Sequence, residues 1–320
     1  MTVVTARAAN DSAATGAARP PLERLWESEA TSTGEVRGRG MPADLVRRYD
    51  GELLVPLQPD RPTVIANFVS TLDGIVAYGT GDLAGGGLIS GGHEPDRFVM
   101  GLLRSLADVV MIGAGTVRGS SAHRWTPGHV HPASARLFEA WRTSMGLAAS
   151  PTTVIVTGSG DIPLGHAGIN DAAIPVVIAT TPRGADRLRG ERLGDHVTVE
   201  AVGSGDGLTG GDILSVGSVR EARVVLTEGG PHLLGQLLTA DILDELFLTL
   251  APQLAGRGAD DRLGLVEGLA FAPADARWER LESVRRSADH LFLRYARRGA
   301  PDPRQTTPRR RPNHESTDPT

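Results

Sequence analysis

One stretch of this 320-residue chain sets its architecture: Arg223-Val-Val-Leu-Thr-Glu-Gly-Gly-Pro-His-Leu-Leu-Gly-Gln-Leu-Leu238. An apolar run of strand length ends at Glu228 and two glycines, and apolar residues then return with helical spacing. Pro231 suits the first position of a helix, where a missing N–H costs no hydrogen bond. The stretch therefore predicts a strand that delivers Glu228 to a glycine-lined helix N-terminus.

Such a junction is suited to binding phosphate. Backbone N–H groups in the first turn of a helix have no internal partners, and the helix dipole adds partial positive charge there. Gly229 and Gly230 lack a Cβ, so a pyrophosphate could lie against the main chain. Glu228 would then face whatever lies beside that ligand. An ordinary helix cap would use the same residues, and this segment alone leaves both interpretations open.

The composition excludes several kinds of chemistry. The chain has no cysteine, and all 33 of its basic residues are arginine. Thiol nucleophiles, disulfides, thiolate zinc sites, a P-loop lysine and a lysine Schiff base are therefore ruled out. Acids, hydroxyls, histidines or a bound cofactor must carry any reaction.

Charge and hydropathy indicate a cytoplasmic protein without a nucleic-acid or membrane partner. The net charge of -5 argues against a general affinity for nucleic acid or anionic lipid. No apolar run approaches the roughly 18 residues of a membrane span. Residues 1–20 are rich in Ala, Thr and Arg and lack the hydrophobic core of a secretion signal.

The chain divides into four parts by composition. Residues 1–20 and 299–320 are predicted to be disordered tails, the second with the solvated cluster Arg309-Arg-Arg311. Residues 21–62 form a lead-in that docks on the main domain, with short helices expected at 22–26 and 42–49. Residues 63–298 form one α/β domain.

Within that domain, apolar runs alternate with helical patterns, an order typical of a parallel sheet covered by helices. Strands are expected at 63–69, 108–112, 152–157, 175–180, 197–202, 223–227 and 245–250, and helices at 95–106, 132–145, 182–193, 213–221 and 231–240. At the C-terminus, residues 278–283 and 290–297 flank 285–289 and predict an antiparallel hairpin.

Two further junctions follow predicted strands. Gly113-Ala-Gly-Thr-Val-Arg-Gly119 departs from the dinucleotide fingerprint by one residue, so it is either a tight turn or a phosphate loop with Thr116 as helix cap. Asp73 follows the first strand, although Asp-Gly is also a favoured turn pair. Ligands of open α/β sheets bind beyond the carboxyl ends of the strands. We therefore expect Asp73, Gly113 and Glu228 to share one pocket.

The remaining polar clusters are less specific. The glycine-rich residues 79–92 have the length of a lid or binding loop. His123, His129 and His131 have no nearby carboxylate and no i, i+4 partner, so no metal site is expected. Asp260 and Asp261 are interpreted as turn residues.

Four segments in order closely resemble the pyrimidine reductases of riboflavin biosynthesis: Asn67-Phe-Val-Ser-Thr-Leu-Asp-Gly74, Leu102-Leu-Arg-Ser-Leu-Ala-Asp-Val-Val-Met-Ile-Gly-Ala-Gly-Thr-Val117, Thr227-Glu-Gly-Gly-Pro-His-Leu-Leu234 and Leu243-Asp-Glu-Leu-Phe-Leu-Thr-Leu-Ala-Pro252. The likeness spans about residues 62–295. It implies the dihydrofolate reductase-like α/β fold, with a mostly parallel central sheet flanked by helices and the C-terminal antiparallel hairpin. It also implies a homodimer, NADPH as cofactor, and reduction of a ribosylamino-pyrimidine phosphate to its ribitylamino form.

The resemblance also implies roles for individual residues. Glu228 and Asp73 would lie at the reacting groups, and Ser90, Arg104 and Glu228 would contact the substrate, Arg104 through its phosphate. Glu228 would either orient or protonate the substrate, or only recognise a pyrimidine N–H. Arg183 is a candidate partner for a 2'-phosphate. The implied cofactor contacts are Asn67, Thr71, Gly113, Gly115, Thr116, Val117, Thr157, Ser159, Gly229, Gly230, Pro231, His232, Leu233 and Leu234.

The chain departs from the family where the substrate should be held. Asn67 stands where lysine is common, and Gly119-Ser-Ser-Ala122 stands where Asp-Asp-Pro is common. The zinc deaminase module of bifunctional relatives is expected to be absent, because it needs cysteine. The family's cofactor and reaction type can therefore be expected of this chain with more reason than the family's substrate. A dihydrofolate reductase-type or specialised-metabolism reductase remains an alternative, as does a non-catalytic nucleotide-binding module.

Overall fold

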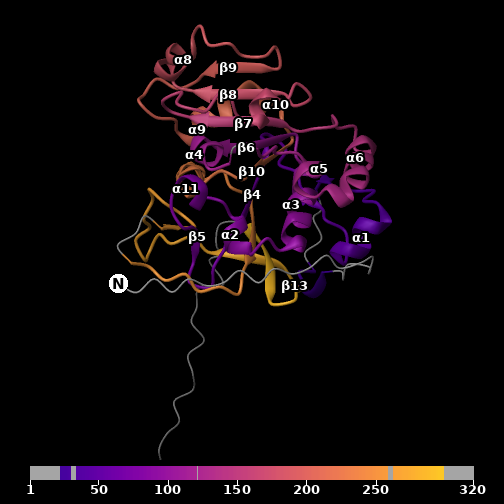
Figure 1. The fold of residues 1–320 in the computed structure, drawn as a ribbon. Helices are drawn as coiled ribbons and strands as arrows, with labels where there is room; N and C mark the ends of the chain where they lie inside the picture. Colours follow the sequence, from indigo (N-terminus) through magenta and orange to yellow (C-terminus); the bar gives the residue numbers. More distant parts are fainter. Residues whose placement is uncertain (1–21, 30–33, 121, 259–261, 299–320) are drawn as a thin grey trace, which may run out of the picture.

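The computed structural model describes residues 22–29, 34–120, 122–258 and 262–298. The predicted tails with Arg309, the loop residue Ser121, and the pair Asp260 and Asp261 lie outside these ranges. Within them, a large sheet carries helices on both faces (Figure 1). A helix able to span a membrane is not found among the described residues.

Ten strands of the described chain form the main sheet. Seven neighbouring strands run parallel, and three antiparallel strands extend one edge. The order across the sheet is β1 (Glu23–Glu27), β13 (Glu279–Ser287), β14 (His290–Arg297), β11 (Glu245–Leu250), β4 (Thr63–Ser70), β10 (Val224–Thr227), β6 (Val109–Gly113), β7 (Thr152–Thr157), β8 (Val176–Thr180) and β9 (Val197–Ala201).

Smaller elements complete the described chain. Two strand pairs lie outside the main sheet: β2 (Val36–Arg37) with β3 (Val55–Pro56), and β5 (Ile75–Ala77) with β12 (Leu263–Gly264). The helices are α1 (Ala43–Tyr49), α2 (Gly87–Ser90), α3 (Glu94–Leu106), α4 (Ala114–Arg118), α5 (Pro127–Val130), α6 (Ala135–Ser144), α7 (Ala167–Asn170), α8 (Pro182–Leu188), α9 (Gly210–Ser215), α10 (Gly217–Glu221) and α11 (Pro231–Thr239), with 3-10 turns η1 (Gly81–Leu83) and η2 (Pro132–Ser134).

Two hydrophobic cores lie on opposite faces of the sheet, because side chains alternate along each strand. In β4, Ile65 enters one core, while Val64 and Ala66 enter the other. Helices α1, α3 and α6 cover the first core, and α9, α10 and α11 cover the second. Figure 1 shows α3, α5 and α6 on one side of the strands and α9 and α11 on the other. The expected fold class, with its mostly parallel sheet and antiparallel C-terminal strands, is confirmed.

The first predicted helix is wrong. Residues 23–27 form strand β1, which pairs with β13. Leu22, Leu25 and Trp26 have helical spacing, but β13 leaves an unpaired edge that this segment fills. Pairing at a sheet edge overrides the local pattern. The second predicted helix of the lead-in forms as α1, and Leu45 and Tyr49 of α1 are buried in the first core.

Several predicted boundaries are also corrected. The helix expected at 213–221 is two helices, because Val216 adopts φ -54° and ψ 129° between α9 and α10. It begins earlier than expected, because Thr209 and Asp212 form a capping box at the start of α9. The helix expected at 132–145 starts with a 3-10 turn, and the one expected at 182–193 ends at Leu188.

The C-terminal hairpin turns later than predicted. Residues 285–287 belong to β13, and Ala288 lies at the turn with φ 48°. Arg285 made this stretch resemble a polar loop, but its side chain is buried. Its guanidinium lies 3.9 Å from the Tyr49 ring centroid and donates to the Tyr49 carbonyl. The buried arginine thus continues the inward-facing side of the strand.

Close packing of α3 on α6 depends on a glycine. A Cβ at Gly101 would lie 2.5 Å from the Phe138 ring. We expect Gly101→Ala to lower the free energy of unfolding by about 1–3 kcal/mol, because an overpacked core must shift. Denaturant unfolding measures the change. Gly211→Ala in α9 is the control, since its nearest such atom is 3.7 Å away and alanine favours helix. Equal stability of the two variants would contradict the packing argument.

Candidate active site

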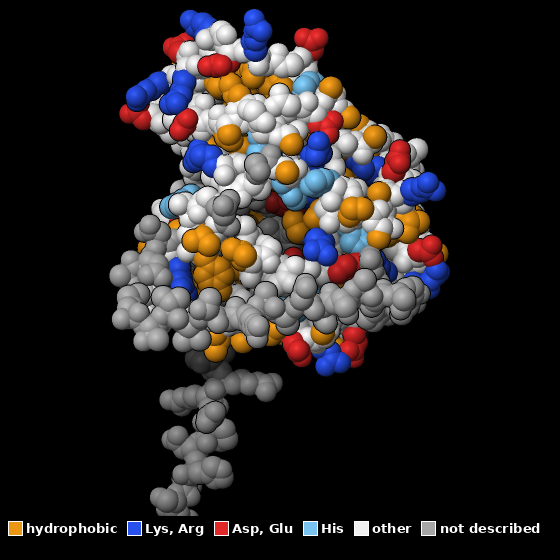
Figure 2. All heavy atoms as spheres, viewed as in Figure 1, with side chains coloured by type: hydrophobic (Ala, Val, Ile, Leu, Met, Phe, Trp, Pro, Cys, Tyr) orange, Lys and Arg blue, Asp and Glu red, His pale blue; other side chains and the backbone are white. Residues whose placement is uncertain are grey.

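A cavity of about 340 Å³ lies beside β4 and beyond the carboxyl ends of β6 and β10. Its size is in the range of small-molecule sites. The space-filling view shows the surface hollowed at this place, with histidine side chains in pale blue beside the opening (Figure 2). The remaining wall comes from α3, the 84–92 segment, and residues between 116 and 130.

The topology of the sheet explains why a cavity forms here. Strand β10 lies between β4 and β6. The chain leaves β4 toward α3 on one face, whereas it leaves β10 into α11 on the other face. Connections that depart to opposite faces of neighbouring strands leave a crevice at the carboxyl ends. The predicted strand–turn–helix at residues 223–238 therefore forms one side of the opening.

The centre of the cavity wall is an ion pair between Glu228 and Arg104. The Arg104 Nη2 lies 2.6 Å from Glu228 Oε2, and its Nε lies 3.1 Å from each carboxylate oxygen. The exposed fractions of the two side chains are 1% and 7%. A buried charge is stable only with such a partner, so the pair fixes a negative carboxylate at the cavity wall.

The other donors of Arg104 are also occupied. Its Nη1 donates to the carbonyl oxygens of Arg124 and Thr126, at 3.3 and 3.2 Å. Its Nη2 lies 3.0 Å from His123 Nε2. Burial and the charge of Arg104 lower the pKa of His123 to about 3, so the ring is neutral. Because an arginine only donates, His123 Nε2 accepts this bond. Arg104 thus holds the wall of the cavity together, and its expected contact with a substrate phosphate stays a prediction.

Asp96 is a second carboxyl group in the same wall, and the sequence interpretation missed it. It lies in the first turn of α3 with 5% exposed, and it hydrogen-bonds with the hydroxyls of Ser90 and Thr249. Burial raises its pKa to about 6, and the negative charge of Glu228 adds to the effect. Asp96, Met100 and Arg104 are spaced by four residues and share one helix face. In the sequence, that spacing was the signal that could have placed Asp96 beside Arg104.

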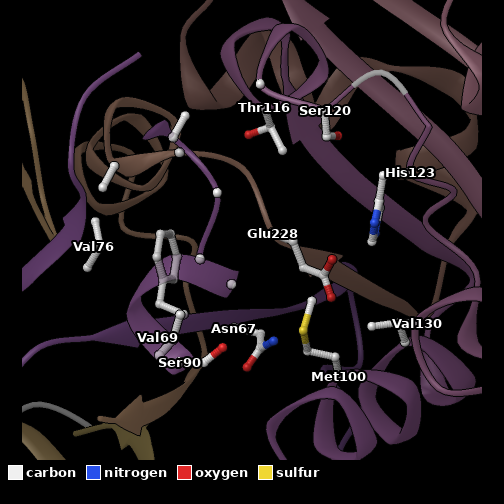
Figure 3. Close-up of a pocket in the computed structure, with 18 of the residues that line it drawn as sticks. Asn67, Val69, Val76, Ser90, Met100, Thr116, Ser120, His123, Val130 and Glu228 are labelled. Carbon is white, nitrogen blue, oxygen red and sulfur yellow. The ribbon is translucent and has the colours of Figure 1, made fainter. Parts of the chain in front are cut away.

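Eight of the predicted site residues line the cavity: Asn67, Ser90, Arg104, Thr116, Glu228, Gly229, Gly230 and Pro231. Figure 3 shows the Glu228 carboxylate in the middle of this lining, with Thr116 and Ser120 on one side and Asn67 and Met100 on the other. Met100, Trp125 and Val130 supply an apolar wall that the sequence interpretation did not identify.

The glycines at the strand ends differ in what they permit. A Cβ at Gly113, Gly115 or Gly230 would meet no atom within 4 Å. A Cβ at Gly229 would lie 2.4 Å from the Leu233 side chain and 3.2 Å from the Gly113 nitrogen. Gly229 therefore permits close packing, whereas the other three border open space. Gly230 is also the N-cap of α11, and no side chain of this cap residue hydrogen-bonds to the first N–H groups of the helix.

The other predicted cofactor residues do not line the cavity: Thr71, Gly113, Gly115, Val117, Thr157, Ser159, His232, Leu233 and Leu234. Leu233 and Leu234 are buried in one hydrophobic core and Val117 in the other, and His232 occupies an exposed position of α11. The Thr157 hydroxyl accepts a bond from the Gly160 N–H, and the Ser159 hydroxyl accepts one from the Asp161 N–H. Arg183 lies in α8, beyond β7.

Asp73 lies outside the cavity lining. Its carboxylate accepts hydrogen bonds from the Thr71 hydroxyl and from the backbone N–H groups of Ala255 and Gly256. These bonds, led by the one from Thr71, lower the pKa of Asp73 to about 2. The Thr71 hydroxyl also accepts a bond from the Ile75 N–H. These bonds tie two loops together, and the expected place of Asp73 at the reacting groups stays a prediction.

Comparison with known proteins identifies the family. Residues 62–291 match the family described as the RibD C-terminal domain. No curated protein matches this chain.

Three solved structures share the fold. A pyrimidine reductase-like protein from Corynebacterium diphtheriae has a TM-score of 0.55 and 19% identity, covering 75% of this chain and 94% of that one. RibD from Acinetobacter baumannii has a TM-score of 0.54 and 20% identity, with 75% and 59% covered. A deaminase and 5-amino-6-(5-phosphoribosylamino)uracil reductase from Thermotoga maritima has a TM-score of 0.53 and 19% identity, with 74% and 57% covered.

These identities establish the fold alone, and this chain spans less than two thirds of the RibD chain from Acinetobacter. The family match is stronger evidence than these structures. It extends from the start of β4 to the last strand and includes every element that lines the cavity. The chain therefore belongs to the RibD C-terminal domain family.

Proposed function

We propose that this chain is an NADPH-dependent reductase of a pyrimidine-type substrate, and that the substrate is 5-amino-6-(5-phosphoribosylamino)uracil. One observation carries the proposal: the buried Glu228–Arg104 pair faces a cavity bordered by open glycines in a chain of the RibD C-terminal domain family. The Thermotoga protein of the same fold is named as a reductase of this compound, which supports the choice of substrate.

The residues at the strand ends fit a dinucleotide. Gly113, Gly115 and Gly230 border space that a larger residue would fill, and the first turn of α11 has no side-chain cap. Backbone N–H groups there suit phosphate oxygens, and the Thr116 hydroxyl on the cavity wall adds a donor. NADPH bound at this place would supply a hydride.

The remaining lining residues fit a small polar heterocycle. Arg104 holds Glu228 as a carboxylate, and a carboxylate is an acceptor for a pyrimidine N–H. Met100, Trp125 and Val130 present apolar surface that excludes water. Arg97 lines the cavity at an exposed position of α3 and offers a second cation, beside Arg104, for the substrate phosphate.

Turnover by the purified protein tests the proposal. Nicotinamide absorbance is followed with NADPH or NADH and with the ribosylamino-pyrimidine phosphate or dihydrofolate as substrate. Rapid oxidation of NADPH with the pyrimidine alone supports the proposal. Oxidation with dihydrofolate instead supports a dihydrofolate reductase-type enzyme. Saturable NADPH binding without oxidation in either mixture supports a nucleotide-binding module and overturns the proposal.

A side chain at Gly230 tests the cofactor position. Gly230 has φ -67° and ψ 174°, which other residues adopt easily, and a Cβ there meets open space. We expect Gly230→Val to weaken NADPH binding by about tenfold or more, because the new side chain fills the cofactor's space. Thermal stability should fall only slightly, because valine is a poorer N-cap than glycine. Isothermal titration and thermal unfolding measure the two effects.

The matched control is Gly165→Val. Gly165 is exposed, borders open space and does not line the cavity. This variant should bind NADPH like the unchanged protein. Unaltered binding by Gly230→Val would remove Gly230 from the cofactor site.

The resemblance to the family also supports two proposals about assembly and location. We propose a homodimer in solution and a cytoplasmic site of action. Light scattering of the purified protein tests the first, and fractionation of cells tests the second.

A further inference from the structure

Two carboxyl groups line the same cavity in opposite environments. Glu228 accepts three hydrogen bonds from the guanidinium of Arg104, with the shortest at 2.6 Å. Asp96 is 5% exposed, and its partners are the hydroxyls of Ser90 and Thr249. A carboxyl group next to a paired cation stays charged, whereas burial away from water favours the neutral form of a carboxyl group. Two acids separated in this way divide into a fixed anion and a proton carrier.

Charged groups around Asp96 favour the neutral form on balance. Glu228 faces it from the end of β10, and that negative charge opposes ionisation. Arg97 is the opposing influence, but its side chain is exposed and therefore screened. Burial outweighs Arg97 and the hydrogen bonds from Thr249 and Ser90, and it places the pKa of Asp96 at about 6. Asp96 is consequently partly protonated near neutral pH.

No other titratable group of the described cavity lining fits a proton donor as well. The lining contains Asp96, Arg97, Arg104, His123 and Glu228. Arginines do not release protons in this range. His123 has a pKa of about 3, and its Nε2 faces a guanidinium N–H. Glu228 is held in an ion pair with Arg104, with Nη2 and Oε2 2.6 Å apart.

We propose that Asp96 is the proton donor of the reduction, and that Glu228 is the fixed anion that orients the substrate. This inference rests on the proposed function. Reduction of a ribosylamino group to a ribitylamino group passes through an opened C=N form and adds one hydride and one proton. The hydride comes from a reduced nicotinamide and forms the new C–H bond. The O–H bond of Asp96 breaks, its proton forms the N–H bond, and Asp96 is left as a carboxylate that solvent reprotonates.

The first test observes the proton itself, without turnover. Infrared spectra of the protein alone are recorded between about pH 5 and about pH 8. A carboxylic-acid C=O band that disappears as the pH rises through about 6 is expected. It should be missing in Asp96→Asn. An unchanged band in Asp96→Asn would assign the proton to another residue and overturn the proposal.

Stability gives an independent readout of the same group. The folded protein holds the Asp96 proton more tightly than the unfolded chain does. The protonated side chain therefore stabilises the folded state at low pH, and this stabilisation is lost as the pH rises through about 6. Asp96→Asn should therefore raise Tm relative to the unchanged protein more at about pH 8 than at about pH 5. A gain of equal size at both pH values would contradict a titrating Asp96.

Kinetics connect the proton to the reaction. The acid form is active, so kcat should fall as the pH rises through about 6. Asp96→Asn should lower kcat by about a hundredfold or more and remove this pH dependence, because asparagine cannot transfer a proton. A wild-type pH profile in Asp96→Asn overturns the donor role while leaving the proposed function intact. Absence of turnover in the unchanged enzyme overturns the proposed function, and with it the donor role that rests on that function.

A second variant keeps the proposal testable if Asp96→Asn does not fold. The Thr249 hydroxyl donates to Asp96 and lowers its pKa, and Thr249 is 2% exposed in β11. Thr249→Val has nearly the same shape and removes only that bond. It should shift the fall in kcat to higher pH. A fall at unchanged or lower pH would contradict the assignment.

Discussion

Arg104→Met is expected to lower the free energy of unfolding by about 3–5 kcal/mol, because it leaves the Glu228 carboxylate buried without its cation. The two side chains are 1% and 7% exposed, so water cannot replace the lost partner. Methionine fills much of the volume of arginine. The change in unfolding free energy therefore reflects the loss of the Arg104 charge more than a loss of packing. Denaturant unfolding near neutral pH measures it.

The double variant Arg104→Met with Glu228→Gln is the control for this expectation. It removes both charges, so it should be more stable than Arg104→Met alone. A coupling energy near zero in the double-mutant cycle would show that the pair contributes nothing to stability. The carbonyl oxygens of Arg124 and Thr126 lose their donor in both variants, so their contribution cancels between the two.

Glu228→Gln is expected to lower kcat by about a hundredfold. A fixed carboxylate in a cavity with little water stabilises positive charge on a bound ligand far better than it would in solution. Glutamine keeps the shape but loses the charge. Steady-state kinetics at saturating NADPH measure kcat, and NADPH titration checks that the cofactor site persists.

Glu139→Gln is the matched control, because Glu139 lies on the exposed surface of α6 and does not line the cavity. It should retain full activity. Should Glu228→Gln retain it as well, the carboxylate at the end of β10 would have no part in the chemistry.

The sequence predicted the central architecture well, because its signals are local. The apolar run before Glu228 and Pro231 after it mark the end of β10 and the start of α11 without reference to the rest of the chain. The strands β7 and β11 were predicted to the residue for the same reason. Strand β1 was missed because a partner distant in sequence, β13, determines its conformation.

The site was predicted only in part, because its chemistry depends on long-range contacts. Arg104 and Glu228 are 124 residues apart, and nothing in either segment indicates the pair. The role of Arg104 toward a substrate phosphate came only from the family resemblance, and its partner Glu228 was not foreseen. Asp96 resembled the common acidic residue of a first helical turn. Only its hydrogen bond with Thr249 and its proximity to Glu228, both set by the fold, distinguish Asp96 from such a surface acid.

Isotope transfer tests the central claim most directly. The enzyme is supplied with 5-amino-6-(5-phosphoribosylamino)uracil and NADPH that carries deuterium at both positions of the nicotinamide C4, and the product is analysed by mass spectrometry. We expect one deuterium bound to carbon in each ribitylamino product, for each NADPH oxidised. A ribitylamino product without deuterium, or oxidation of NADPH while the pyrimidine is unchanged, would contradict the account.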